Sequence, residues 1–444
     1  MNLSQQIINA LSTAYSGSKE KNNLFTYLPY RNKGNRFDYA ITAGHTLGLI
    51  IGKELKPSFR FEKFQSKCLD EIGSLLSEES FLDHLEKMYF ENNALQLVAP
   101  DFLLLRQSEK PPSASKHLSE IYESFMAFSH VDAALDSHPN FVETIILKQL
   151  QGHLKDRKPN EKQYPYLPYI AELFVKDLSF LCHKTDYLLQ YSDQFLELYN
   201  FIYCSQMALN IRGWKSGQPG SKPLYFILDN EKAGQERTEI HRNGFLPLYK
   251  SSEALFPILS MLDRLNRDGD KKYPLWKFAE AIQEADIETQ MKVTEIINAW
   301  AENFRDKNGL KVKEGTSENP AINALEVLIQ YAQDQFDTQS SSRHEIRTAY
   351  QKEFEKQVCR HFVQSRGRSG RVLVLSQDYL LLLTNLIVGK QQKVHFQELL
   401  KGFRDRGVCF DKQSEKSLLT FYDRVGNVDR LSDSGDAVYV RSTI

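Results

Sequence analysis

The carboxy-terminal stretch of residues 376–440 limits most strongly what this chain can fold into. It contains three helix-like segments, each followed by a glycine, and then a β-prone tail; the segments are 377–388, 395–406 and 414–425, and the tail is 430–440. Glycine just past the last apolar residue is a common end of a helix. Three short helices, a tight turn between the last two and a hairpin follow the order of a winged helix-turn-helix. Such modules bind nucleic acid or dock other proteins, and the pattern leaves both alternatives open.

The rest of the sequence predicts a mainly α, multidomain protein. With 444 residues the chain is long enough for two or three domains. Polar stretches at 109–115 and 337–342 suggest the boundaries, and the second is the main one. We therefore expect a mixed or helical N-terminal region at 1–109, a central helical domain at 116–336, and a basic C-terminal module at 343–444 that contains the winged helix at 376–441. The run Leu224–Leu228 is the clearest strand, so a short β element is expected there.

Two further segments have patterns that predict particular helices. Residues 42–51 are apolar and small, and Gly44, Gly48 and Gly52 recur every fourth position. On a helix these glycines would share one side and permit a close approach of another element. Beyond the main boundary, apolar residues recur every four positions from Ile346 onward, which predicts one long helix over 343–364.

Charge is distributed unevenly along the chain although the whole chain has a net charge of −1. Residues 60–143 carry eight more acidic than basic side chains, whereas residues 343–416 carry seven more basic than acidic ones. An acidic surface repels DNA, so the first region is either a solvated face or a site for a basic protein partner. Any attraction to nucleic acid is expected from the C-terminal module.

The cysteines and the apolar runs bear on compartment and cofactors. The five cysteines are dispersed and form no Cys-x-x-Cys pair, which argues against a structural zinc site and is typical of a reducing cytoplasm. Residues 1–13 lack the basic start and apolar run of a signal peptide, and no stretch approaches the ~20 apolar residues of a membrane span. We expect a cytoplasmic protein without a membrane partner, a metal or a cofactor.

A search for catalytic motifs finds little. The glycine-lysine pairs at 52–53 and 389–390 lack the following Ser or Thr of a phosphate-binding P-loop. Neither the zinc-protease nor the serine-hydrolase pattern occurs. The carboxylates of Asp229 and Glu231 follow a strand and could serve a divergent Mg²⁺-dependent nuclease, but their spacing suits a turn capped by Asp229. The leading expectation is a protein that is not an enzyme.

The predicted winged helix suggests which side chains would contact DNA. Asp411 or Ser414 is expected to cap the third helix, whose apolar side faces inward. Polar side chains then lie on its outer N-terminal part, where recognition helices meet the major groove and phosphates. A short basic loop before the first helix also suits phosphates. The candidate DNA-binding residues are Arg360, Arg366, Arg368, Arg371, Lys412, Gln413 and Lys416. The predicted wing carries Asp433 and Asp436 instead of basic residues, which favours protein docking for that part.

Several strings in the sequence resemble a known family. Residues 406–411 (Arg-Gly-Val-Cys-Phe-Asp) and 431–440 are similar to the C-terminal signature of the DptG (DndG) family, and residues 224–232 with the following Arg237 are similar to its central part. That family is the G component of the DNA phosphorothioation-dependent restriction system of bacteria. The resemblance covers the middle and end of the chain. Asn230 departs from the aromatic residue expected beside Asp229.

The resemblance implies one subunit of a three-component defence complex that acts on DNA lacking phosphorothioate linkages. Its partners would be double-stranded DNA and the F-type and H-type subunits, which carry the ATPase motors. The family pattern supplies no catalytic residues to transfer. The expected function is therefore a non-catalytic, DNA-contacting adaptor subunit. A scaffold that binds only proteins is the alternative.

Overall fold

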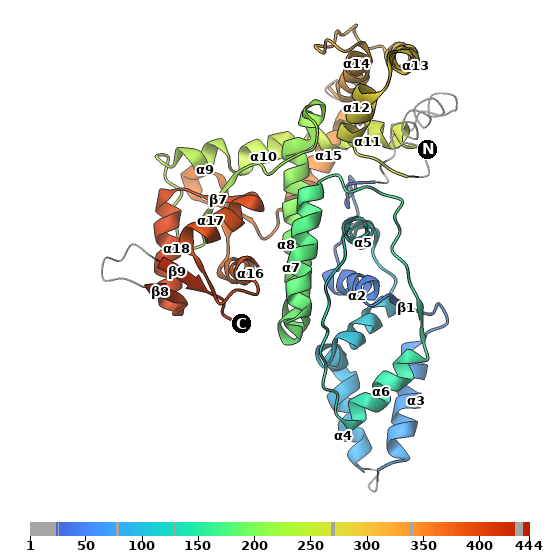
Figure 1. The fold of residues 1–444 in the computed structure, drawn as a ribbon, viewed down its shortest axis with the longest axis vertical. Coiled ribbons are helices and arrows are strands. Elements are labelled where there is room, and N and C mark those ends of the chain that lie inside the picture. The colour runs from blue at the N-terminus through green and yellow to red at the C-terminus, as the bar shows by residue number, and fades with distance from the viewer. Residues whose placement is uncertain are drawn as a thin grey trace.

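The computed structural model describes residues 24, 26–76, 80–127, 129–267, 271–337, 341–430 and 438–444. Over these residues the chain is mainly helical with small sheets, as predicted (Figure 1). The predicted wing residues Asp433 and Asp436 lie outside the described residues. None of the helices in the described ranges combines the length and the apolar character that crossing a bilayer would require.

The chain up to residue 156 consists of helices with one small two-stranded sheet. Its elements are α2 (Tyr39–Ile50), β1 (Lys53–Leu55), α3 (Phe61–Gly73), α4 (Ser80–Phe90), η1 (Glu91–Leu97), η2 (Pro100–Ser108), α5 (Ser113–Met126), α6 (Phe141–Gln151) and β2 (Leu154–Asp156). Strand β1 pairs antiparallel with β2. Helices α3, α4 and α6 enclose a small core of their own around Phe64 and Ile146, which are fully buried. They form a lobe that projects from the rest of the molecule (Figure 1).

Helix α2 confirms the close packing expected of its glycines. A Cβ atom added at Gly44 would lie 2.7 Å from the backbone oxygen of Leu103, and one added at Gly48 would lie 2.6 Å from the backbone oxygen of Lys53. Gly52 differs, because it follows the helix and has a φ of +66°. The two helical glycines therefore let η2 and β1 approach the backbone of α2.

Replacing Gly44 by alanine should lower the free energy of unfolding by about 1–3 kcal/mol, because the new methyl group overlaps a backbone oxygen that cannot move alone. Alanine is otherwise the better helix former by about 0.5–1 kcal/mol, so a measured loss reports on packing. Gly220→Ala is the control, since a Cβ atom added at that position would have nothing within 4 Å of it. Chemical denaturation of wild type and both variants measures these changes. A Gly44→Ala variant as stable as the Gly220→Ala control would contradict the packing role of Gly44.

The central region is built on two long helices. They are α7 (Pro168–Cys182) and α8 (Thr185–Asn210), which lie against each other along much of their length (Figure 1). The remaining elements are η3 (Ile211–Ser216), β3 (Leu224–Leu228), α9 (Thr238–Arg242), α10 (Phe245–Ser252), α11 (Leu255–Leu265), α12 (Leu275–Glu284), α13 (Ile287–Asn308) and α14 (Pro320–Asp334). The strand predicted at Leu224–Leu228 is thus present.

A four-stranded sheet connects the central region with the C-terminal part of the chain. Its other strands are β4 (Val363–Ser365), β5 (Arg371–Leu375) and β7 (Val408–Phe410), and its order is β4-β5-β3-β7. Strand β3 is parallel to both β5 and β7, while β4 is antiparallel to β5. Because β3 lies between strands from beyond residue 342, segments on the two sides of the predicted boundary share one sheet.

The predicted long helix over 343–364 is wrong at its end. Helix α15 (Ser342–Glu353) continues into a π-helical turn, η4 (Phe354–Val358), and the chain then enters β4. Val363 pairs with Leu373 of β5, so sheet pairing replaces helical hydrogen bonds there. The following loop is the turn of a β-hairpin, with a short 3-10 segment η5 (Gly367–Ser369).

The C-terminal part contains the three predicted helices and a three-stranded sheet. The elements are α16 (Gln377–Val388), β6 (Lys393–His395), α17 (Phe396–Asp405), α18 (Lys412–Val425), β8 (Val428–Arg430) and β9 (Val438–Arg441). The sheet has the order β6-β9-β8, with both pairings antiparallel. The connection predicted as a tight turn between α17 and α18 is strand β7, which belongs to the four-stranded sheet.

Candidate nucleic-acid interface

The loop 229–237, which follows β3, links the two places where DNA contacts were predicted. On one side Arg366 of the β4–β5 hairpin donates to the backbone oxygen of Asp229 at 2.7 Å, and Ser369 donates to the backbone oxygen of Ala233. On the other side Glu231 accepts a hydrogen bond from Ser414 at the start of α18, at 2.7 Å. The structure therefore brings the basic hairpin and the start of α18 into contact with one loop.

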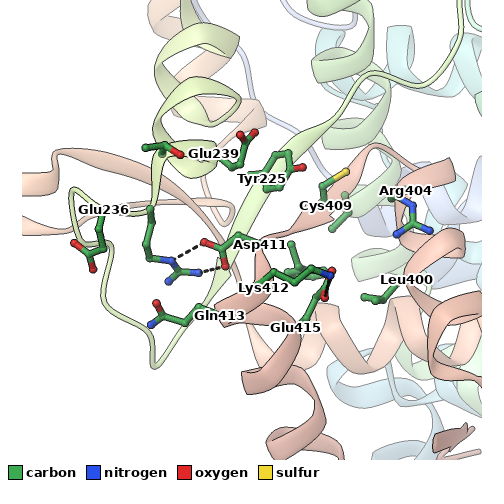
Figure 2. Close-up of a pocket in the computed structure, with 14 residues that line it drawn as sticks. Tyr225, Glu236, Glu239, Leu400, Arg404, Cys409, Asp411, Lys412, Gln413 and Glu415 are labelled. Carbon is green, nitrogen blue, oxygen red and sulfur yellow. Dashed lines mark hydrogen bonds and ion pairs between the residues drawn. The ribbon is translucent and has the colours of Figure 1, made fainter. Parts of the chain in front are cut away.

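A buried charge cluster fixes this loop to α18. The guanidinium group of Arg237 donates to both carboxylate oxygens of Asp411, at 2.8 and 2.6 Å, and to Glu231 Oε2 at 2.7 Å. It also donates to Ser414 Oγ at 2.6 Å. The side chains of Arg237 and Glu231 are only 3% and 5% exposed. Figure 2 shows the two bonds that Asp411 accepts. A bidentate arginine–carboxylate pair holds a defined geometry, so the start of α18 is rigidly placed.

The surroundings of Asp411 and of Arg237 favour their charged forms. Burial pushes the pKa of Asp411 upward, but the hydrogen bonds from Arg237 and from the backbone amide of Ser414 outweigh it and hold the pKa below its ordinary value. Burial likewise opposes the charge on Arg237, yet its bonds to Asp411 and Glu231 raise its pKa. Asp411 is also the N-cap of α18, because its side chain accepts from the amide of Ser414 at 2.9 Å. Of the two predicted caps, Asp411 is the one observed.

The candidate DNA-binding residues at α18 are on the surface. Lys412, Gln413 and Lys416 are all exposed. Lys412 is 89% exposed and forms an ion pair with Glu415 at 2.8 Å. The ammonium group of Lys412 thus faces solvent, although the side chain of Glu415 is only 19% exposed.

The candidate residues of the hairpin differ from one another. Arg368 is exposed at the tip, whereas Arg366 is held by Asp229 and its side chain is only 26% exposed. Gly367 and Gly370 have φ values of +55° and +73°, which side chains rarely adopt, and so shape the turn. Arg371 pairs with Glu355 and lies 5.0 Å over the ring of Phe245. Only Arg368 projects from this hairpin without such an engagement among the described residues.

Arg360 belongs to a different part of the surface. It is exposed and follows the π-helical turn. Its positive charge partly opposes the rise that burial causes in the pKa of Tyr39 and Tyr379. The neighbouring His361 pairs with Glu197 of α8 at 3.3 Å. Neither the loop 229–237 nor α18 contributes to these contacts.

Two residues near the candidate contacts are not among the site residues predicted from the sequence. Lys232 is exposed on the loop between the hairpin and α18, and Arg237 organises the cluster. Arg237 and Asp411 are 174 positions apart, so one sequence contains no local signal of their pairing. The resemblance in residues 224–237 is the only feature of the sequence that points toward them.

The geometry does not favour the nuclease alternative. Asp229 accepts from Gln364 of the hairpin at 2.8 Å, while Glu231 is turned toward Arg237 and Ser414. The two carboxylates thus have separate partners. Throughout the described ranges, no three His, Cys, Asp or Glu side chains gather in a way that could hold a metal ion.

Comparison with known proteins adds no identification. No protein family matches the chain, and no curated protein resembles it closely enough to count as a match.

Proposed function

We propose that residues 376–441 form a winged helix whose third helix, α18, contacts duplex DNA, and that the chain is a non-catalytic adaptor subunit. The observation that supports this proposal is the order of elements α16-β6-α17-β7-α18-β8-β9, in which β7 belongs to the four-stranded sheet and β9 lies between β6 and β8. A helix, a strand, two helices and a hairpin whose last strand is central is the arrangement of winged helices. In those modules the last helix is the one that enters the major groove.

The surface chemistry at the start of α18 supports DNA as the ligand. Lys416, Gln413 and Lys412 are exposed there, and Arg368 and Lys232 are exposed on the adjoining hairpin and loop. Lysine and arginine supply the phosphate contacts, and a glutamine can read a base edge. The fixed position of α18 through Arg237 and Asp411 lets these side chains present one constant surface.

The wider role follows from the sequence resemblance. The adaptor would belong to a phosphorothioation-dependent restriction complex for antiviral defence in the cytoplasm, which acts on unmodified DNA. The F-type and H-type subunits would supply ATP hydrolysis. The chain would bring the duplex and those subunits together without catalysing a step itself.

A scaffold that binds only proteins is the second candidate. The observation that favours it is the groove beside α18, which has Glu236 and Glu239 on one wall. Carboxylates in that position repel a phosphate backbone and suit a protein neighbour.

Photo-crosslinking would separate the two candidates. A photoreactive amino acid at position 420, on the exposed side of α18, should form an adduct with a duplex of about 30 base pairs. The matched control is position 311, an exposed site between α13 and α14 on the helical hairpin at the far end of the molecule (Figure 1). Adducts at both positions, or at neither, would count against contact through α18.

A further inference from the structure

The four-stranded sheet has one fully covered face and one partly covered face. Along β3, Leu224 and Phe226 point into the main core, whereas Ile227 belongs to a small cluster with Val372, Val374 and Ile240. Ile240 lies on α9, which has only five residues. Tyr225, on the same face as Ile227, is the register partner of Cys409 in β7. Helix α9 therefore covers the β5–β3 half of this face, and the β7 half lies beyond it.

A groove of about 540 Å³ lies beside the β7 half of this face. Tyr225, Cys409 and Leu400 line it, with Cys409 and Leu400 only 7% and 3% exposed, and it runs between the start of α9 on one side and α17 with the start of α18 on the other (Figure 2). Parallel strands are normally covered on both faces, because their side chains are apolar on both. The groove thus adjoins the part of this face that α9 does not reach.

The walls of the groove carry opposite charges. Two pairs along the rim are internally neutralised, Arg237 with Asp411 and Lys412 with Glu415. What remains is Glu236 and Glu239 on the α9 wall and Arg404 on the α17 wall (Figure 2). Glu236 and Arg404 are exposed, and Glu239 is partly buried. An anionic polymer would be repelled by the first wall, while a segment with charges of both signs is attracted by both.

We propose that this groove docks a short segment of a partner protein that places an apolar side chain over Tyr225 and Cys409. A basic residue of that segment faces Glu236 and Glu239, and an acidic residue faces Arg404. The volume is within the range of about 300–1,000 Å³ that is typical of binding clefts. The segment packs beside the part of the sheet face that α9 does not reach. This docking builds on the groove that favours the scaffold candidate, and because Lys412 and Gln413 also line that groove, it lies next to the proposed DNA contact of α18.

The test uses peptides selected from a displayed library of random 12-residue sequences on the full-length chain. Synthetic copies of the enriched peptides are titrated against wild type and against Glu236→Lys/Glu239→Lys by fluorescence polarisation. Charge reversal of one wall should weaken binding by about tenfold or more, because like charges then face each other. Glu295→Lys/Glu302→Lys, which makes the same charge change on the exposed side of α13, should leave the affinity within about twofold.

Two further measurements make the result specific. A peptide whose basic residue is changed to glutamate should bind the reversed wall better than it binds wild type. Arg404→Glu tests the opposite wall and should weaken the original peptides independently, even if Glu239→Lys disturbs the loop through its bond to Asn243. Selection of no peptide, or of peptides that bind all these variants as they bind wild type, would overturn the proposal. Duplex binding by the same variants reports separately on α18.

Discussion

Replacing Arg406 by methionine is expected to lower the free energy of unfolding by about 3–5 kcal/mol, because it leaves a buried carboxylate without its counter-ion. Arg406 donates to both oxygens of Asp177, at 3.0 and 2.5 Å, and the side chains are 3% and 0% exposed. Tyr199 donates to the same carboxylate at 2.6 Å. Burial opposes the charge on Arg406, but Asp177 outweighs it and holds the pKa of the guanidinium above its ordinary value. The pair joins the end of α17 to α7, so its loss loosens the C-terminal part from the central helices.

The double variant Asp177→Leu/Arg406→Met is the control for this prediction. Replacing both partners by apolar side chains removes the charge along with its counter-ion, so part of the stability should return, although the buried hydroxyl of Tyr199 then loses its acceptor. Urea unfolding followed by circular dichroism measures both variants. Surface substitutions usually change the free energy of unfolding by about 0.5 kcal/mol or less. If Arg406→Met lowers the free energy of unfolding by no more than such a surface substitution, the pair does not hold the C-terminal part to the central helices.

Arg237→Met should cost about 3 kcal/mol or more, since two carboxylates then share a buried site without a positive charge. Glu231 and Asp411 both depend on this one guanidinium group. Glu231 Oε1 is buried and has no hydrogen-bond partner among the described residues. No donor on that oxygen could therefore compensate for the loss of the guanidinium group. The start of α18 should lose its fixed position, and duplex binding should weaken along with stability. Normal stability combined with normal duplex binding would contradict the role of the cluster.

The cluster also predicts a pH dependence. The pKa of Asp411 is lower in the folded chain than its ordinary value, so its contribution to stability is present above the unfolded pKa of about 3.9 and is lost as the pH falls through the folded value. Asp411→Asn keeps an amide oxygen that can cap the helix but removes the charge. The difference in unfolding free energy between wild type and this variant should be full at pH 7 and shrink below about pH 4. A difference that does not change over this range would refute the charged pairing.

Local patterns in the sequence predict the helices but not the elements that depend on distant partners. The small apolar residues of 42–51 indicate α2, the glycine-ended segments indicate the three C-terminal helices, and the run Leu224–Leu228 indicates β3. Strands β4 and β7 have three residues each and exist through pairing with β5 and β3. Such short strands have no period of their own, which is why the sequence predicts helix for residues 363–364 and a link for residues 408–410.

The same limit applies to the candidate interface. Exposure on the outer side of α18 follows from helical periodicity, and Lys412, Gln413 and Lys416 lie there as predicted. Whether an arginine is free depends on acids elsewhere in the chain: Arg366 is held by Asp229 and Arg371 by Glu355. These partners come from other elements, which no local pattern could assign.

The salt dependence of duplex binding tests the central claim most directly. Each phosphate contact that is lost reduces the slope of log affinity against log salt by about 0.9. The variant Lys232→Ala/Arg368→Ala/Lys416→Ala removes exposed side chains around the proposed interface, while Lys292→Ala/Lys307→Ala/Lys311→Ala removes three at or next to α13. We expect the slope to fall by about two to three units in the first variant and to stay unchanged in the second. Equal slopes for wild type and both variants would contradict DNA binding through this surface.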